Sequence, residues 1–264
     1  MKVRLRLPLL GPAGEPVDLL RTLNSHGFAD LPPLQLDEAA HTLELTIRVP
    51  GARSRRVRVG PGGRRHHAAI EILGPGTPGA RVQAAVLQGV RHVLRMDQDL
   101  SAFYDACADD PDLAWAAAGA GRMLRSPTVF EDVIKTVCTT NCTWSATVRM
   151  VNALVTHLGD PAMGGAGPLT NTFPSPERMA AAPEPFYRDT VRAGYRGAYL
   201  IALARTVAGG ELDLEALGAA GRDELPDDEL ERTLIALPGV GPYAAAHIMM
   251  TMGRHSRLIL DSWT

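Results

Sequence analysis

Near the C-terminal end of the chain, a glycine-rich turn separates two segments with helical periodicity. It runs Leu-Pro-Gly-Val-Gly-Pro-Tyr-Ala-Ala-Ala over 237–246, with Gly239, Val240 and Gly241 at its centre. Glycine supplies φ freedom for the turn, and Pro242 suits the start of the next helix because its missing N–H would be unpaired there. Backbone N–H groups at such a turn, backed by the positive end of a helix dipole, can bind a phosphate. The segment predicts a phosphate-binding helix–hairpin–helix; an ordinary connection between two helices is the alternative.

An aspartate that follows this turn is a candidate catalytic carboxylate. Asp261 comes twenty residues after Gly241 and directly follows the apolar run Leu258-Ile-Leu260, which can hold a carboxylate in a partly dry cleft. Removal of a base from a nucleotide leaves the sugar as an oxocarbenium-like cation, as in glycoside hydrolysis. A fixed carboxylate can stabilise this cation and can orient or deprotonate a water molecule. For any single aspartate, the alternative role is a helix N-cap.

The secondary structure that must position these residues is predicted to be strands in the first part of the chain and helices in the rest. Alternating Val, Ile and Leu predict strands in the first part, and the Gly/Pro-rich segment 74–79 ends this pattern. Helical spacing dominates from there on. The expected strands are Lys2–Leu7, His41–Val49, Arg55–Val59 and Ala68–Leu73. The expected helices are Val17–Leu23, Arg81–Leu94, Leu100–Ala106, 111–120, Val129–Leu158, Pro176–Ala181, Pro185–Val191, Tyr199–Val207, Asp213–Ala219 and Asp227–Leu237.

These patterns predict an α+β fold class. We expect a small N-terminal antiparallel β-rich domain over residues 1–79. A larger all-helical domain follows over 80–264 and contains the helix–hairpin–helix at about 227–252. The segment 161–172, rich in Gly and Pro, is expected to be a loop.

Composition narrows the possible classes of protein. Hydrophobic residues make up 45% and charged residues 21% of the chain, and no apolar stretch reaches the roughly 18 residues of a membrane span. The first residues alternate charged and apolar types and lack the apolar core of a secretory signal. We therefore expect a cytoplasmic protein, associated with the nucleoid if the source is bacterial.

Charge and cysteine usage add two further expectations. Residues 1–95 hold 14 Lys and Arg against 7 Asp and Glu, whereas residues 96–264 hold 13 against 22. The basic part can lie along phosphate, although a solvated sheet rich in arginine is the simpler interpretation. Cys107, Cys138 and Cys142 are too few for a disulfide framework or a four-thiolate iron–sulfur cluster. Cys138 and Cys142 are expected to be small buried residues, and no metal site is expected.

Several segments, in this order along the chain, resemble the helix–hairpin–helix (HhH-GPD) superfamily of base-excision DNA glycosylases. Residues 124–143, which end in Thr-Thr-Asn-Cys-Thr, are similar to the helix that presents an asparagine to DNA in the 8-oxoguanine and 3-methyladenine branches. Phe-Pro-Ser-Pro at 173–176 and Gly-Tyr-Arg-Gly-Ala-Tyr at 194–199 resemble two further segments of these branches. The hairpin and Asp261 complete the pattern.

The resemblance implies a role for each matched residue. Asp261 matches the catalytic aspartate. Asn141 matches the asparagine that fills the gap left by a flipped base, while Tyr195 and Arg196 match a wedge tyrosine and an arginine that reaches the orphaned base. A side chain in the vacated space offsets part of the unstacking cost. The alternatives are a helix cap for Asn141, a core aromatic for Tyr195 and a surface phosphate contact for Arg196.

The chain departs from bifunctional members of this superfamily at one informative position. Those members carry a nucleophilic lysine two residues after the second hairpin glycine, and Tyr243 stands there instead. Without an amine no Schiff base forms, which favours a monofunctional enzyme that uses water. An aromatic residue here resembles the 3-methyladenine DNA glycosylase II branch, in which Tyr243 would stack on an electron-poor alkylated purine. An 8-oxoguanine-type glycosylase and a non-catalytic protein that binds damaged DNA are the alternatives.

The resemblance also defines the expected partners. The substrate would be double-stranded DNA containing a damaged base, bound by a monomer without any membrane contact. No cofactor is required, a monovalent cation at the hairpin is compatible with the pattern, and no iron–sulfur cluster is supported. Family members continue beyond the aspartate, so further chain is expected after Thr264. Because the helical part is acidic, Arg149, Arg192 and Arg196 are expected to supply local positive charge.

Overall fold

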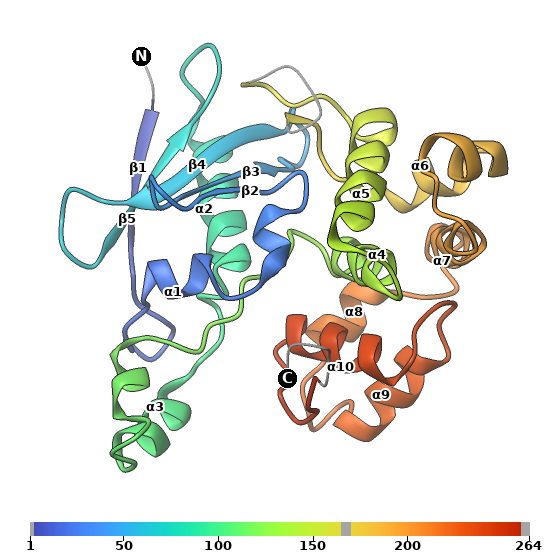
Figure 1. Cartoon of the computed structure of the whole chain (residues 1–264). Coiled ribbons are helices and arrows are strands. Elements are labelled where there is room, and N and C mark those ends of the chain that lie inside the picture. The colour runs from blue at the N-terminus through green and yellow to red at the C-terminus, as the bar shows by residue number, and fades with distance from the viewer. Residues whose placement is uncertain (1–2, 165–169, 260–264) are drawn as a thin grey trace. The chain divides into compact units, whose positions relative to one another are not determined.

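The computed structural model describes residues 3–164 and 170–259, and Asp261 lies outside these ranges. Packing divides the chain into two compact units (Figure 1). The first consists of Met1–Pro127 with Pro161–Thr172, and the second of Thr128–Asp160 with Phe173–Thr264. A β-sheet lies in the first unit and the second is helical, so the α+β class predicted from the sequence is confirmed.

The first unit is built on a five-stranded antiparallel sheet with the strand order β1-β5-β4-β3-β2. Four strands fall where alternation predicted them, because successive side chains of a strand point to opposite faces of the sheet. The short strand β2 was not predicted, since three residues are too few to show a period. The strands are β1 (Val3–Pro8), β2 (Gln35–Asp37), β3 (Thr42–Ile47), β4 (Arg55–Pro61) and β5 (His67–Ile72).

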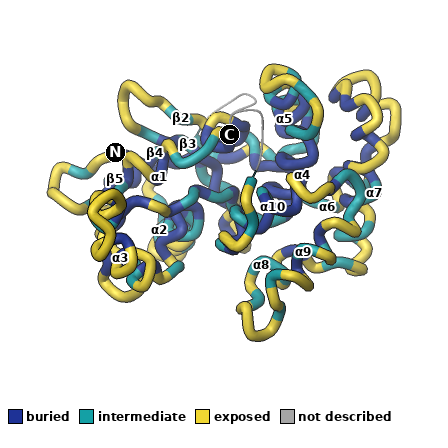
Figure 2. Tube along the Cα trace, turned by 60° about the horizontal axis from the view of Figure 1, so that its bottom comes forward, coloured by how far each residue is buried: buried dark blue, intermediate teal, exposed yellow. Residues whose placement is uncertain are grey.

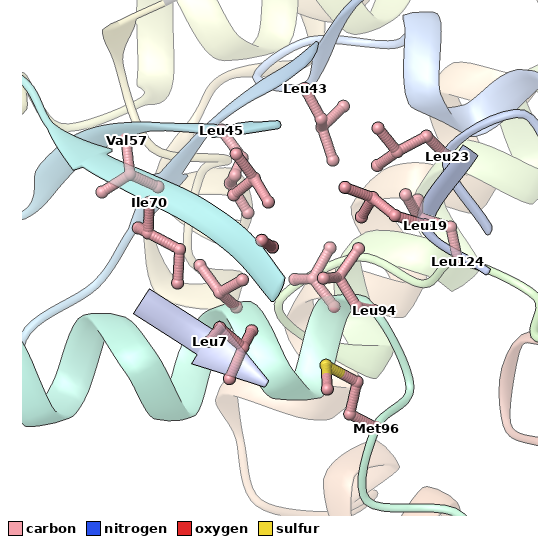
Figure 3. Packing of buried hydrophobic residues seen from close by; sticks show 14 of the residues in the cluster. Leu7, Leu19, Leu23, Leu43, Leu45, Val57, Ile70, Leu94, Met96 and Leu124 are labelled. Carbon is pink, nitrogen blue, oxygen red and sulfur yellow. The ribbon is translucent and has the colours of Figure 1, made fainter. Parts of the chain in front are cut away.

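Helix α2 (Ala80–Val93) packs on this sheet and closes its core. Val86, Val90 and Val93 lie on one helical face and join the apolar side chains of the strands in a single cluster. Figure 3 shows Leu45 and Ile70 of the sheet in this cluster. The boundary predicted at residue 79 therefore marks the change from strands to helices and not the division in packing, because α2 buries its apolar face against the sheet.

Shorter elements complete the first unit. Asp18 caps α1 by accepting the N–H of Arg21, and the alanine-rich segment expected to be helical forms a 3₁₀ helix. These elements are α1 (Leu19–Leu23), the 3₁₀ helix η1 (Gly27–Asp30), α3 (Ser101–Ala108) and the 3₁₀ helix η2 (Ala114–Ala118). Met163, from the segment expected to be a loop, pairs through its backbone with Ser54 and Arg56.

The second unit is a set of helices around one central helix. They are α4 (Val129–Thr139), α5 (Trp144–Leu158), α6 (Pro176–Ala181), the π-helix η4 (Phe186–Thr190), α7 (Arg196–Ala208), α8 (Leu214–Ala219), α9 (Asp227–Ile235) and α10 (Pro242–Thr251). No helix in the described ranges is long and apolar enough to cross a bilayer.

The single helical run expected over Val129–Leu158 is two helices. The chain breaks at Asn141, whose φ of 46° lies in the left-handed region, where an asparagine is more tolerated than most residues. Thr143 then starts α5, because its side chain accepts the N–H of Ala146. Helical periodicity continues across this break, which is why the sequence did not reveal it.

Helix α4 is buried on all sides. Every residue from Phe130 to Cys138 is buried, and α5, α7, α8 and α10 all contact the helix (Figure 2). Two of its three buried charged residues pair within the helix, since the Lys135 Nζ lies 2.6 Å from Glu131 Oε1 at the favourable i, i+4 spacing. α4 is therefore the fixed element against which the rest of the second unit is arranged.

A buried ion pair in the first unit joins the segment before α2 to the segment after α3. Arg122 lies 2.6 Å from Glu15, and their side chains are 0% and 6% exposed. Arg122 also donates to the carbonyls of Arg95 and Gln98. Burial by itself would raise the pKa of Glu15, but backbone N–H groups and Arg122 donate to the carboxylate and hold its pKa below the ordinary value.

We predict that Arg122→Met lowers the free energy of unfolding by about 3 kcal/mol, because it leaves the Glu15 carboxylate buried without its cation. The matched control is Arg21→Met, which breaks a pair whose arginine side chain is 49% exposed and should cost less than about 1 kcal/mol. Urea unfolding of both variants at neutral pH measures the difference. Equal losses in the two variants would contradict the assigned role of the buried pair.

Candidate nucleic-acid interface and active site

One hollow of about 590 Å³ in the second unit collects most of the residues that the sequence singled out. The end of α4, the start of α7 and the turn before α10 all open into it. Its lining residues are Thr139, Thr140, Asn141, Cys142, Tyr195, Tyr199, Gly239, Gly241, Pro242, Tyr243 and Ala244. Residues distant in sequence therefore meet around a glycine turn.

The two glycines of the hairpin have different structural requirements. Gly239 has a φ of 80°, and a Cβ on it would lie 2.7 Å from the Tyr199 ring. Gly241 is extended, and a Cβ there would meet nothing within 4 Å. The fold thus requires glycine at 239 but not at 241. At 241 the missing side chain leaves the backbone open to an approaching group.

Three of the backbone N–H groups at the hairpin have no acceptor among the described residues. Val240 is 6% exposed and its N–H donates to the Leu237 carbonyl, which closes the turn. The N–H groups of Gly239, Gly241 and Ala244 have no acceptor in the part of the chain that the structure describes. Because Gly241 caps α10, these donors lie where the helix dipole is positive, a setting that suits an anion.

Asn141 is exposed at the rim of the hollow and is held there by its neighbours. Arg196, at the start of α7, is only 7% exposed, and its Nε donates to the Thr140 carbonyl over 3.0 Å. Its Nη2 donates to the same oxygen. The guanidinium also lies 4.6 Å from the centre of the Tyr195 ring. Arg196 thus lies behind the loop that presents Asn141, and its predicted contact with an orphaned base stays a prediction.

Three tyrosines give the hollow an aromatic wall. Tyr195 is 55% exposed, and its ring meets that of Tyr199 edge to face with centroids 5.9 Å apart. Tyr243 stands on the first turn of α10 with 38% of its surface exposed. Exposed aromatic faces around a hollow are surfaces on which nucleobases can stack.

The predicted site residues therefore divide into three groups. Those that line the hollow are Asn141, Tyr195, Gly239, Gly241 and Tyr243. Val240 and Arg196 are buried behind it. Asp261 lies outside the described residues. Sequence reasoning missed Tyr199, although its spacing of four residues from Tyr195 places both on one helical face.

None of the described residues that line the hollow is a lysine or an arginine. Among the three arginines expected to supply local positive charge, Arg149 and Arg192 are exposed and Arg196 is buried. The chain has only two lysines, Lys2 and Lys135. Lys2 lies outside the described residues, and Lys135 is completely buried against Glu131. Lys135 is therefore in no position to act as an amine nucleophile at the hollow.

The two cysteines near the site are free thiols. Cys138 is buried. Its burial, and to a smaller extent the nearby Cys142, raise the pKa of its thiol to about 12. Cys142 donates its Sγ hydrogen to the Cys138 carbonyl. No group of three or more His, Cys, Asp or Glu in the described ranges is placed to hold a metal ion.

Comparison with known proteins places this geometry in context. No family model matches the chain. A probable bifunctional transcriptional activator and DNA repair enzyme AlkA of Mycobacterium tuberculosis is 31% identical over 163 residues, covering 61% of this chain and 31% of that protein. A DNA-3-methyladenine glycosylase of Bacillus subtilis is 27% identical over 157 residues, covering 59% and 50%. The matches thus span half or less of these relatives.

Two solved structures share the fold along nearly the whole chain. MBOgg1 in complex with a low-affinity DNA ligand matches with a TM-score of 0.71 and 19% identity, over 98% of this chain and 80% of that one. The 3-methyladenine DNA glycosylase of Archaeoglobus fulgidus matches with a TM-score of 0.67 and 19% identity, over 96% and 80%. The chain is thus similar in sequence to these two curated proteins over about three fifths of its own length, and it shares the fold of both solved structures.

Proposed function

We propose that this protein is a monofunctional DNA N-glycosylase, which extrudes a damaged base from duplex DNA and hydrolyses its N-glycosidic bond. The observation that carries the proposal is the single hollow in which the glycine hairpin, Asn141 and Tyr243 meet. The hairpin is suited to a DNA backbone, the asparagine to the duplex interior and the tyrosine to a base.

The first step of the proposed reaction is a hold on the phosphate backbone. The N–H groups of Gly239, Gly241 and Ala244 would donate to one phosphate, with the positive end of α10 behind them. Such contacts fix the position of the protein on DNA without reading its sequence. The open space beside Gly241 lets the sugar–phosphate chain come close.

The second step is extrusion of the base, which costs a few kcal/mol of lost stacking and pairing. Asn141 would enter the vacated space and pair with the orphaned base, and Tyr195 would lie against the neighbouring stack. Arg196 supports both residues, because it donates to the Thr140 carbonyl and lies beside the Tyr195 ring. We assign Arg196 as a positioning residue for this step.

The third step is hydrolysis of the N-glycosidic bond. The Asp261 carboxylate would stabilise positive charge on the sugar and take a proton from the attacking water, while the base departs with the bond's electron pair. The buried Lys135 and the tyrosine at 243 support water as the nucleophile. This chemistry requires no metal or organic cofactor, and a monovalent cation at the hairpin would serve only DNA binding.

The substrate class follows from the aromatic wall. Alkylation leaves a purine electron-poor, and such a ring gains more from stacking on Tyr243 than an ordinary base does. The curated Bacillus relative carries the name of a 3-methyladenine enzyme, which supports the same class. The fold itself is shared by MBOgg1 and a 3-methyladenine enzyme, so it does not separate an alkylated purine from 8-oxoguanine.

Base release from duplex oligonucleotides tests the proposal directly. The substrates carry 3-methyladenine, 1,N6-ethenoadenine, hypoxanthine or 8-oxoguanine, and each reaction contains EDTA and is split into samples with and without alkali. We expect release of an alkylated purine and strand cleavage only after alkali. Asp261→Asn should slow release by about 10³-fold and leave the Kd for DNA unchanged. Asp223→Asn, an exposed carboxylate of the same unit, is the control.

Each other outcome of this experiment points elsewhere. Strand cleavage without alkali would mean that an amine nucleophile acts, and the monofunctional assignment would fail. Release of 8-oxoguanine alone would reassign the substrate. Tight binding to damaged DNA with no base released from any duplex would favour a non-catalytic protein that recognises lesions.

The two hairpin glycines provide a matched pair of variants. Gly239→Ala should destabilise the fold by about 1 kcal/mol or more, because alanine disfavours a positive φ and its Cβ would meet the Tyr199 ring. Gly241→Ala should change stability by less than about 1 kcal/mol and still raise the Kd for duplex DNA. Urea unfolding and fluorescence anisotropy separate the two effects. A Gly241→Ala variant that binds DNA as tightly as the wild type would show that the hairpin does not contact the backbone.

A further inference from the structure

A second hollow, in the first unit, is lined by basic side chains. It measures about 430 Å³ and lies between strand β1 and the hairpin that joins β4 to β5. Arg4 and Arg6 approach it from β1, and Arg64 and His67 approach it from the hairpin. None of the described residues that line it carries a carboxylate. The proposed enzymatic function makes no use of this surface.

The sheet register explains why these residues meet. Arg4 and Arg6 are two positions apart on β1, so their side chains lie on the same face of the sheet. Arg6 stands opposite Ala69, whose methyl group leaves space beneath the guanidinium. The hairpin is fixed next to β1, because the Leu9 N–H donates to the His66 carbonyl and the Gly62 N–H donates to the His67 carbonyl.

A carboxylate of the neighbouring strand balances part of this charge, because Glu71 stands opposite Arg4 in the register. Deeper in the same sheet, Arg58 forms ion pairs with Glu44 and Glu71, at 2.5 Å and 3.3 Å. By contrast, Arg4, Arg6, Arg64 and Arg65 are exposed and form no ion pair with the described residues. Clustered like charges repel one another, and a bound anion removes this cost. The cluster therefore favours a ligand with several negative charges.

Phosphate is the anion that such a cluster suits best. Guanidinium groups bind phosphate oxygens through paired N–H donors, and side chains on alternate strand positions can reach separate phosphates. The distribution of charge points to a polymer. The second unit, which contains the proposed active site, holds 11 Lys and Arg against 16 Asp and Glu, while the first unit holds 16 against 13. An acidic catalytic unit needs cations from elsewhere to hold DNA.

We infer that Arg4, Arg6 and Arg64 form a second binding site for the phosphate backbone of duplex DNA, separate from the glycine hairpin. The inference rests on the proposed function in taking DNA as the partner. The site reads no sequence and contributes affinity through release of counterions, so its contribution falls as salt rises.

The test is the salt dependence of binding to an undamaged duplex, measured by fluorescence anisotropy with the full chain. Arg6→Gln/Arg64→Gln should lower the slope of log K against log salt by about 0.9 for each phosphate that the variant no longer neutralises. Arg53→Gln/Arg81→Gln removes the same charge from exposed positions of the same unit and should leave the slope unchanged. Unfolding curves of both variants should match the wild type.

Two further measurements distinguish DNA from free phosphate as the ligand, and this inference from the glycosylase proposal. At matched ionic strength, inorganic phosphate should displace DNA no better than chloride does. Strong displacement that requires Arg6 and Arg64 would instead identify a free-phosphate site and overturn the inference. Equal slopes for the wild type and Arg6→Gln/Arg64→Gln would also overturn it. Base release at saturating DNA should be the same for the wild type and for Arg6→Gln/Arg64→Gln. If the wild type releases no base and the variant binds DNA more weakly than the wild type, only the glycosylase proposal is overturned.

Discussion

The burial of helix α4 is the constraint on which the second unit depends. A helix that is buried along its whole length cannot shift without opening several contacts at once, because protein interiors are close-packed. Its charged residues make the constraint stronger. Separating Lys135 from Glu131 would leave a charge without its partner in the interior, at a cost of several kcal/mol. The residues that follow α4 therefore start from a fixed point.

This fixed point gives the Asn141 loop its function in the proposed mechanism. Asn141 takes a left-handed conformation directly after the helix, and Arg196 holds the preceding carbonyl from behind. Because α10 also packs on α4, the same helix positions both the hairpin and the Asn141 loop. The hairpin grips the DNA backbone while Asn141 enters the duplex and extrudes a base. The distance between these two contacts must therefore stay constant.

Much of this arrangement could be predicted from the sequence, because some residue types allow only one local backbone conformation. The Pro/Gly pattern at 237–242 permits little other than a turn between helices, and strands with one buried face show their period. Other features depend on contacts that spacing does not contain. The sequence shows no sign that Arg196 turns inward to a backbone carbonyl, or that Tyr199 lies against Gly239. The break at Asn141 was hidden for the same reason, because apolar periodicity continues from α4 into α5.

The most direct test of the central claim, that Asn141 replaces an extruded base, uses 2-aminopurine placed in a duplex beside a damaged base. Its fluorescence rises when stacking is lost. The wild type should raise the signal on binding. Asn141→Gly keeps the left-handed backbone and removes only the side chain, so it should bind the same duplex, as followed by anisotropy, with a much smaller rise. An equal rise in the two proteins would contradict the account and assign extrusion to other residues.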